Sequence, residues 1–438
     1  MRPVLAAALC ACAAFMCACA GPSRAYKTKL QGQIAAGNYD GAIAEINAAK
    51  TKEYSKKNSV LYHLDLGMVE HDAGKCEQSD ADFDAAEARM DELYTKSISR
   101  AAGTLLINDN TTEYAGEPHE RALLNVFRSL NFICLGRLDD AAVEARKVAF
   151  YLDHLRQARG GKYNYRDDGF AQYLASLVFS ETGKADDARI CMANAMNAYA
   201  AYPAGFAMPA PQQAAPPGGG NGEIVFFHYN GMAPAKVSRT FQVAWNDAVI
   251  AMRASGDAEA GGARVKNALD AGILGNAITV SYPEYEDMPF IIKSSEVSAD
   301  SAAVSAKTEV VENIAAIARD ELANAAAAQR TRMVARAAIK YILAKAAEQK
   351  AEQQSQGLGL LAKVVAGAVT AATEVADTRS WATLPAEIRM ARLELPPGRY
   401  DLKLTFRDAY GNAAASDVMR GVEVSRGKRT FAHYRTAR

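Results

Sequence analysis

The chain has 438 residues, of which 50% are apolar and 23% are charged. This length predicts two or three domains, and the apolar share is that of a globular protein with ample material for a core. Lys plus Arg and Asp plus Glu number 50 each. A nucleic-acid-binding protein usually carries a basic excess, so this balance argues against a nucleic-acid partner.

Residues 1–18 are predicted to form a lipoprotein signal peptide. Arg2 precedes the apolar run PVLAAALCACAAFM, and small residues follow it, which is the order that export signals share. The run is too short for a membrane-spanning helix, which needs about 20 residues. Cys10 and Cys12 lie inside this removable segment, so we interpret them neither as a disulfide nor as a metal site.

The sequence around Cys19 resembles the bacterial lipobox, in which the cysteine becomes the new N-terminus and is diacylated on sulfur. Ala18 fits the position before the cleavage site, and Met16 replaces the usual Leu. Ala20 stands where an Asp commonly retains lipoproteins in the inner membrane. The resemblance implies a lasting lipid anchor, detectable with palmitate, on the periplasmic face of the outer membrane. An ordinary secretory leader cut nearby is the alternative.

Three further cysteines follow, at Cys76, Cys134 and Cys191. Each lies in an apolar, helical context, so the simplest expectation is three small buried side chains. An exported chain meets an oxidising compartment, however, so one disulfide with one remaining thiol is the alternative.

Residues 19–201 are predicted to contain a helical repeat. Four segments share a Gly followed by a polar residue and a helix, with a small residue five positions after the Gly. Three upstream helices carry another small residue seven positions before it. Gly allows a tight turn, and small residues let two helices pack closely. The glycines are Gly37, Gly74, Gly136 and Gly183; the later positions are Ala42, Ser79, Ala141 and Ala188, and the earlier ones are Gly67, Ser129 and Ser176.

The pattern resembles the tetratricopeptide repeat, which consists of a helix, a Gly turn and a second helix. Consecutive turn glycines are 37, 62 and 47 residues apart, whereas the repeat length in the family is about 34 residues. We therefore expect a degenerate tetratricopeptide-like α-solenoid whose extended concave surface binds protein or peptide. A plain helical bundle without a binding groove is the alternative.

Residues 202–222 are rich in Pro, Ala and Gly and are predicted to be an interdomain linker. Residues 223–438 are predicted to be an α+β domain, in which a helical insert at about 305–376 interrupts β-strands. The strands suggest an immunoglobulin-like or transthyretin-like sandwich. The final segment GVEVSRGKRTFAHYR predicts a terminal hairpin that turns at Arg426 and Gly427.

The segment 357–376 is apolar but contains Lys363 and Glu374. We expect a buried or amphipathic helix, with membrane or oligomer contact as the alternative and a bilayer crossing least favoured. Arg379 and Trp381 follow it. They form either a recognition patch or a turn in which Trp381 packs into the sandwich.

Three motifs, FFHYNGMAPAK, YPEYEDMP and DTRSWATLPAEI, follow the repeats, and LPPGRYDL comes after them. With the leader, they make the chain resemble a family of uncharacterised bacterial outer-membrane lipoproteins with degenerate tetratricopeptide-like repeats and a C-terminal α+β region. The resemblance covers nearly the whole mature chain. It implies an envelope role and carries over no reaction, cofactor or catalytic residue.

Candidate catalytic and metal-binding residues are sparse, so we expect no cofactor and no metal site. His63 and His71 are eight residues apart on a predicted helix, too far apart for one ion without help. Glu284, Glu286 and Asp287 form the acidic cluster that an enzyme could use. A solvated loop is the simpler interpretation of that cluster.

Together these features predict a lipid-anchored envelope protein that is not an enzyme. It would bind envelope protein partners through its helical repeats, as a scaffold or assembly factor, and could form an oligomer. The alternatives are a cell-wall or polysaccharide-active enzyme with its site in 223–438, and an oligomeric membrane-associated component that uses helix 357–376.

Overall fold

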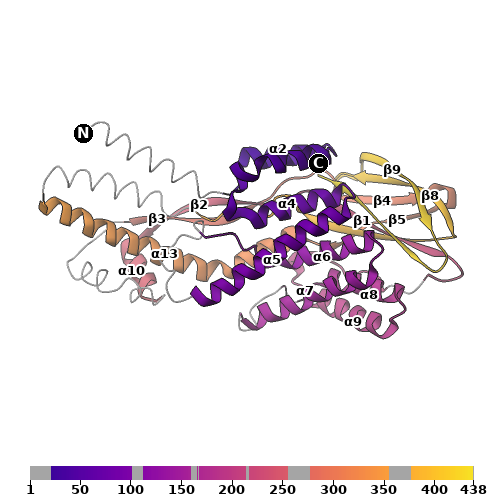
Figure 1. Ribbon diagram of the computed structural model, residues 1–438, viewed down its shortest axis with the longest axis horizontal. Coiled ribbons are helices and arrows are strands. Elements are labelled where there is room, and N and C mark those ends of the chain that lie inside the picture. Colours follow the sequence, from indigo (N-terminus) through magenta and orange to yellow (C-terminus); the bar gives the residue numbers. More distant parts are fainter. Residues whose placement is uncertain are drawn as a thin grey trace.

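The computed structural model describes residues 21–100, 112–158, 165, 167–213, 217–254, 277–354 and 376–437. A helical N-terminal part is followed by a part that mixes strands and helices, so the chain combines α and α+β structure, as predicted. Figure 1 shows the helices and two sheets grouped into one body, from which an arm made of a long helix and a strand hairpin extends.

The N-terminal part is a row of antiparallel helical hairpins. The turn inside each hairpin holds a predicted Gly in the left-handed region, with φ between 70° and 74°, where a side chain would be strained. The helices are α2 (Arg24–Ala35), α3 (Tyr39–Ala49), α4 (Ser59–Asp72), α5 (Cys76–Arg100), α6 (Pro118–Cys134), α7 (Leu138–Ala158), α8 (Gly169–Glu181) and α9 (Ala185–Ala201).

The small residues predicted from the repeat lie where the two helices of a hairpin cross. In three hairpins a serine hydroxyl on one helix donates a hydrogen bond to a backbone carbonyl on the other. A Cβ at Gly67 would lie 2.8 Å from the ring of Phe83, so a larger residue would push α4 and α5 apart. The hydrogen bonds join Ser79 to Gly67 (2.6 Å), Ser129 to Ala141 (2.8 Å) and Ser176 to Ala188 (2.8 Å).

The strands of the body form two four-stranded sheets. The first has the order β10–β1–β7–β6 and the second the order β5–β4–β8–β9. The strands are β1 (Gly222–Asn230), β4 (Ser294–Ala299), β5 (Val304–Lys307), β6 (Glu309–Glu312), β7 (Glu387–Leu395), β8 (Gly398–Arg407), β9 (Ala413–Val424) and β10 (Arg429–Thr436).

The predicted terminal hairpin is wrong. The chain does turn at Gly427, where φ is 68°. However, β9 belongs to the second sheet, whereas β10 crosses to the first and pairs in parallel with β1, with Arg429 opposite Glu223. A turn residue marks a reversal of the chain but does not select the strand that becomes the partner.

Strand β1 is buried on both faces. Ile224 and Phe226 pack between the two sheets, together with Leu404 of β8, whereas Phe227 and Tyr229 pack against the helices. Burial on both sides explains why this strand is a continuous apolar run without alternation. The body therefore has three layers, in the order helices, first sheet and second sheet.

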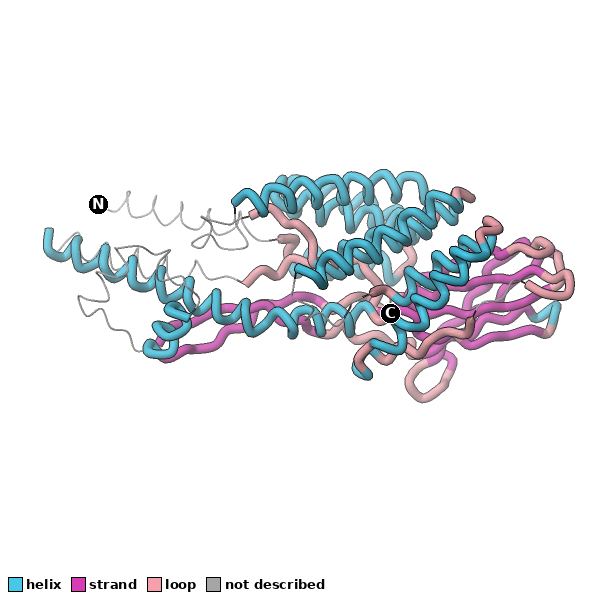
Figure 2. Tube along the Cα trace, turned by 90° about the horizontal axis from the view of Figure 1, so that it is seen from below, coloured by secondary structure: helices cyan, strands magenta, loops and turns pink. Residues whose placement is uncertain are grey.

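The arm has a hydrophobic core of its own. Strands β2 (Ala235–Ala244) and β3 (Ala277–Glu286) form an antiparallel hairpin. The core joins them to α10 (Trp245–Ala254) and to the 41-residue α13 (Ile314–Gln354). Trp245 and Tyr341 meet there with ring centroids 5.0 Å apart. Figures 1 and 2 both show the arm extending away from the two sheets.

Two segments differ from the expectation. Because β5 and β6 precede it, the long helix begins at Ile314, later than residue 305. In the segment 202–222, Phe206 and Met208 are buried in the core shared with the helices. The side chain of Asn313 donates a hydrogen bond of 2.9 Å to the carbonyl oxygen of Phe206. Part of this segment therefore packs onto the body.

Candidate functional site: a groove on the outer helices

One face of the helical array is covered by the first sheet. Phe127 of α6 meets Tyr229 of β1 with ring centroids 5.7 Å apart, and Phe170 of α8 meets Phe227 at 5.5 Å. Helices α4, α6 and α8 are almost entirely buried as a result. A partner of the array would therefore bind on its opposite, outer side.

A groove with a volume of about 450 Å³ lies on that side and is lined by residues of α5, α6 and α7. Figure 1 shows where these three helices lie. We call this groove the α5–α7 groove. Most of its lining side chains are charged or polar, and two are aromatic, of which Phe150 is highly exposed. The lining residues are Asp84, Glu87, Ala88, Asp91, Arg121, Asn125, Lys147, Phe150 and Tyr151.

Arg128 supports the groove from below, and its side chain is only 7% exposed. Its guanidinium contacts Asp80 at 2.9 Å and Asp84 at 3.0 Å, and it also pairs with Glu87. Burial alone lowers the pKa of Arg128, but the hydrogen bond to Asp80 and the charge of Glu144 raise it above its ordinary value. The guanidinium is therefore permanently charged, and it cross-links α5 to α6 over two turns of α5.

Lys147 and Asn125 complete the floor. The Lys147 ammonium donates to Glu87 at 3.2 Å and to Glu144 at 2.9 Å, and the Asn125 amide donates to the same two carboxylates at 2.9 Å each. Burial raises the pKa of Glu87, but the Asn125 hydrogen bond and the charges of Lys147 and Arg128 hold it below its ordinary value. The floor is thus an ionised network with fixed geometry.

The rim of the groove is exposed. Phe150 on α7 is 76% exposed, and the side chains of Asp84 and Asp91 on α5 are 67% and 59% exposed. At one end the hydroxyl of Tyr94 lies 2.9 Å from Nε2 of His154 and ties the two walls together. Aromatic side chains are enriched at protein–protein interfaces, so the exposed ring of Phe150 beside rigidly held charges makes this groove a candidate site.

Sequence reasoning missed these residues. A signal was present, because Asp80, Asp84, Glu87 and Asp91 follow each other at intervals of four, three and four residues, which places them on one helix face. Their partners on α6 and α7 could not be predicted, since those contacts depend on how separate hairpins pack.

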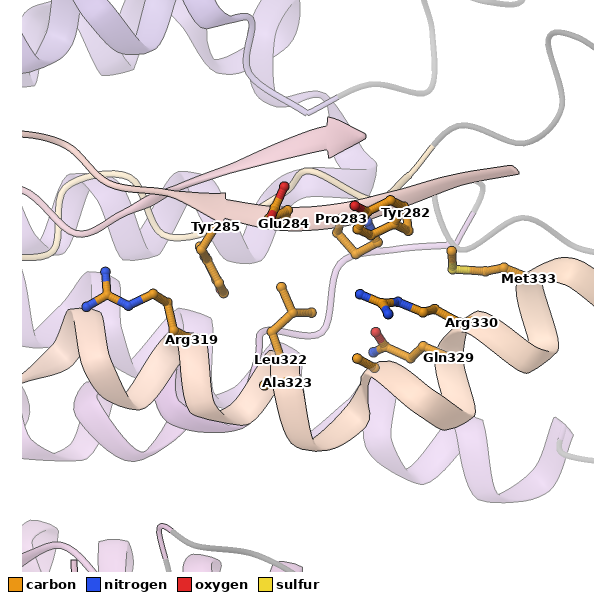
Figure 3. Close-up of a pocket in the computed structure, with 11 residues that line it drawn as sticks. Tyr282, Pro283, Glu284, Tyr285, Arg319, Leu322, Ala323, Gln329, Arg330 and Met333 are labelled. Atoms are coloured by element: carbon orange, nitrogen blue, oxygen red, sulfur yellow. The ribbon is translucent and has the colours of Figure 1, made fainter. Parts of the chain in front are cut away.

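A second, smaller cleft lies in the arm between β3 and α13 (Figure 3). Its volume is about 230 Å³, whereas ligand pockets usually measure about 300–1,000 Å³. Leu322 and Met333 of α13 contribute apolar lining, and the guanidinium of Arg330 lies over the ring of Tyr282 at 5.1 Å. The α5–α7 groove is larger and combines an exposed aromatic ring with fixed charges, so it is the stronger candidate.

The acidic cluster of the arm does not form a pair of catalytic carboxyls. Glu284 pairs with Arg239 at 3.0 Å, and Asp287 pairs with Arg319 of α13. Glu286 is exposed, like the other two. In Figure 3 the Glu284 side chain points away from α13. Exposed carboxylates with arginine partners lack the environment that prepares a carboxyl for general acid or base catalysis.

The two helical histidines have separate environments. His63 lies near the surface with Nδ1 2.6 Å from Asp82. His71 is buried between Asn131 at 2.7 Å and Tyr229 at 3.0 Å, and burial lowers the pKa of its imidazole to about 3. Within the described ranges, no group of three or more His, Cys, Asp or Glu side chains is placed to hold a metal ion.

Two of the motifs that carry the family resemblance form buried hydrogen bonds with other elements of the fold. In FFHYNG, the ring of His228 hydrogen-bonds to Ser295 at 2.8 Å and to Thr436 at 2.7 Å, which links three strands. In DTRSWATLP, the backbone N–H of Trp381 donates to the buried Glu120 at 2.7 Å. These residues hold the layers together and line neither the groove nor the cleft.

Arg379 and Trp381 do not form a recognition patch, because both are only 2% exposed. The ring of Trp381 packs against Phe83 and Phe127, with centroids 5.6 Å and 6.1 Å apart. It therefore lies among the helices, and the expected packing into the sandwich is wrong. The guanidinium of Arg379 pairs with Asp377 at 2.6 Å.

The three thiols are not equivalent. Cys76 and Cys134 form a disulfide that joins the start of α5 to the end of α6, and Cys191 is a buried free thiol whose pKa is raised by burial. The expectation of three unpaired side chains is therefore wrong, and the alternative of one disulfide with one thiol is confirmed.

Three predicted features lie outside the described residues, namely the signal peptide 1–18, the lipidation site Cys19 and all but the last residue of the helix 357–376. Of the helices in the described ranges, none combines the length and the apolar character that a bilayer crossing requires.

Comparison with known proteins returns no match to a family model, a curated protein or a solved structure. The groove is therefore interpreted from its own geometry.

Proposed function

We propose that this chain is a lipid-anchored protein of the bacterial cell envelope that acts as a protein-binding scaffold or assembly factor. Cys19 would carry the lipid and attach the chain to the periplasmic face of the outer membrane. The lipobox-like sequence supports the anchor. The Cys76–Cys134 disulfide supports export, because disulfides persist in oxidising compartments such as the periplasm.

The helical hairpins are, in this proposal, degenerate tetratricopeptide-like units within the lipoprotein family that the motifs resemble. The recurring left-handed Gly and the serine-to-carbonyl hydrogen bonds support this assignment. The two sheets would correspond to an immunoglobulin-like or transthyretin-like sandwich. The parallel pairing of β1 with β10 departs from the antiparallel sheets of the immunoglobulin fold.

The observation that carries the proposal is the α5–α7 groove. Repeat arrays usually bind partners on an extended surface, and here the first sheet already covers one side of the array. The groove leaves Phe150 76% exposed beside a rigid network of charges. Burial of such a ring by a partner would supply binding energy, since aromatic anchors dominate interface energetics.

A pull-down from detergent-solubilised envelope tests the scaffold function. Phe150→Glu should remove the proteins that co-purify with the wild-type full chain, because a charge replaces the aromatic anchor. Tyr410→Glu is the matched control, since Tyr410 is 90% exposed on the turn between β8 and β9, and it should change nothing. If Phe150→Glu left every co-purifying protein in place, the scaffold proposal would be wrong for this groove.

The two alternatives rest on other parts of the chain. A cell-wall or polysaccharide-active enzyme would need the acidic cluster of the arm, two of whose carboxylates are paired with arginines. An oligomeric membrane-associated component would need helix 357–376. Neither alternative has a specific observation in its favour among the described residues.

A further inference from the structure

We infer that the partner of the α5–α7 groove is a positively charged polypeptide segment that carries an apolar side chain between its cationic residues. This inference rests on the proposed function, because it names the chemistry of the segment that the scaffold would hold. Three features of the groove carry it, namely its charge balance, the spacing of its exposed carboxylates and the position of Phe150.

The charge of the groove and its floor is negative. Five carboxylates face three cations, which gives 5 − 3 = 2 negative charges in excess. Each of the three cations is already in an ion pair with at least one of the carboxylates. The carboxylates are Asp80, Asp84, Glu87, Asp91 and Glu144, and the cations are Arg121, Arg128 and Lys147.

The most exposed carboxylates of this set stand at the rim. Glu87 and Glu144 have side chains only 15% and 7% exposed, and the floor cations hold them in place. Asp84 and Asp91 keep more than half of their side-chain surface exposed. Asp84 pairs with Arg128 at 3.0 Å and Asp91 pairs with Arg121. Arriving cations would meet these two exposed carboxylates first and would share them with the two arginines.

The spacing of the two rim carboxylates sets the spacing of the cations. Asp84 and Asp91 are seven residues apart on α5, which is two helical turns or about 10 Å along the axis. Lys or Arg residues about three apart in an extended segment, or about seven apart in a helix, span the same distance. Phe150 stands on the opposite wall, where an apolar side chain between the cations would cover it.

Other occupants are disfavoured by the same charges. An acidic segment would face repulsion from the rim, and juxtaposed like charges oppose binding. A wholly apolar segment would take water away from Asp84 and Asp91 without replacing it, which costs free energy for any charged group. A nucleic acid would bring further negative charge to a negative surface.

Selection from a phage-displayed random-peptide library on the detergent-purified full chain tests the inference. Each selected clone is tested again on Phe150→Glu, and only clones that lose binding count as groove-dependent. We expect these clones to share two Lys or Arg residues at one of the two spacings, with Leu, Phe or Trp between them.

The affinity of a consensus peptide for the full chain is then measured by fluorescence anisotropy. Asp84→Lys with Asp91→Lys should weaken its binding by about tenfold or more, because two attractive contacts become repulsive. The control is Asp40→Lys with Asp186→Lys, which makes the same change in net charge outside the groove, at side chains that are 85% and 96% exposed. This control should leave the affinity unchanged.

The possible failures are distinguishable. Groove-dependent clones that are acidic or purely apolar would overturn the inference and leave the scaffold function standing. The same holds for basic clones that bind the Asp84→Lys, Asp91→Lys variant as tightly as the wild type. If no clone depended on Phe150, the proposed function itself would be contradicted.

Discussion

Arg128 is the residue on which the shape of the groove depends most. It lies beneath the floor and holds together carboxylates that would otherwise repel each other, because Asp80, Asp84 and Glu87 all point from α5 toward the same guanidinium. An exposed ion pair contributes little to stability, whereas removal of one partner from a buried pair leaves an uncompensated charge. The ion pairs that Arg128 makes with Asp80 and Glu87 are of the buried type.

Arg128→Met should therefore destabilise the protein strongly. The expected loss in the free energy of unfolding is about 3 kcal/mol or more, since the neighbouring carboxylates lose their main counter-charge. Urea denaturation at neutral pH measures it. Arg137→Met is the control, because its side chain is 57% exposed beside Asp140, and it should have only a small effect. Equal losses in both variants would show that Arg128 has no special structural role.

His228 makes stability depend on pH. Burial lowers the pKa of its ring to about 3, and the charges of Arg389 and Arg435 add to this effect. In the unfolded chain the imidazole titrates near pH 6.5, so below that value the unfolded state binds a proton that the folded state does not. The contribution of His228 is therefore fully present above about pH 6.5 and is lost as the pH falls toward 3.

A His228→Gln variant should lose less stability on acidification than the wild type. Over the range from pH 6.5 to 4, the difference in unfolding free energy between the two proteins should change by about 1.4 kcal/mol per pH unit in favour of the variant. Denaturation curves at several pH values measure this slope. If the unfolding free energies of the two proteins changed in parallel with pH, His228 would not be buried in its neutral form.

At the scale of elements, the disulfide is the connection most open to test. It joins α5 to α6 across a sequence separation of 58 residues, and it ties the first helical hairpin of the groove to the second. Cys134 lies at the exposed end of α6, whereas Cys76 is buried.

Reduction of this disulfide should destabilise the helical array. A loop of this length corresponds to about 4 kcal/mol in the chain-entropy model, which urea denaturation with and without reductant measures. Alkylation of the unfolded mature chain should modify Cys191 alone before reduction, and Cys76 and Cys134 in addition afterwards. Three modified cysteines before reduction would contradict the pairing.

The elements differ in how far the sequence predicts them. The hairpin turns were predictable, because Gly37, Gly74, Gly136 and Gly183 act locally through their backbone conformation. Strand β8 was predictable because Leu402, Leu404 and Phe406 alternate with other residues, which is the pattern of a strand with one buried face. The parallel partner of β10 was not, since Arg429 and Glu223 are 206 residues apart and no local pattern records which strand completes a sheet.

At the scale of the whole molecule, the arm has a core separate from the two cores of the body, and the two tryptophans lie in different parts. Trp245 lies in the core of the arm, and Trp381 lies in the core that the helices share with the first sheet. The chain therefore carries an internal fluorescent probe for each part.

A core substitution in the arm should affect one probe only. Ile339 is fully buried in the arm, so Ile339→Ala is expected to cost about 2–5 kcal/mol there. The fluorescence transition of Trp245, measured in the Trp381→Phe background, should shift to lower urea concentration. The transition of Trp381, measured in the Trp245→Phe background, should stay in place. Equal shifts of both probes would mean that arm and body unfold as one unit.

The candidate site shows the limit of sequence reasoning most clearly. The acidic face of α5 was visible in the spacing of Asp80, Asp84, Glu87 and Asp91. The floor cations and the exposure of Phe150 depend on the packing of α5, α6 and α7, and the sequence alone does not specify that packing. In contrast, Glu284 and Asp287 looked like a site in sequence but are neutralised by arginines from other elements.

Site-specific photo-crosslinking in the intact envelope tests the central claim most directly. A photoreactive phenylalanine analogue placed at Phe150 should give one discrete protein adduct, and Asp84→Lys with Asp91→Lys should abolish it. The same analogue at Tyr410, which is also highly exposed, should give no such adduct. The absence of an adduct at position 150, or the same adduct at both positions, would contradict the claim that the α5–α7 groove holds a protein partner.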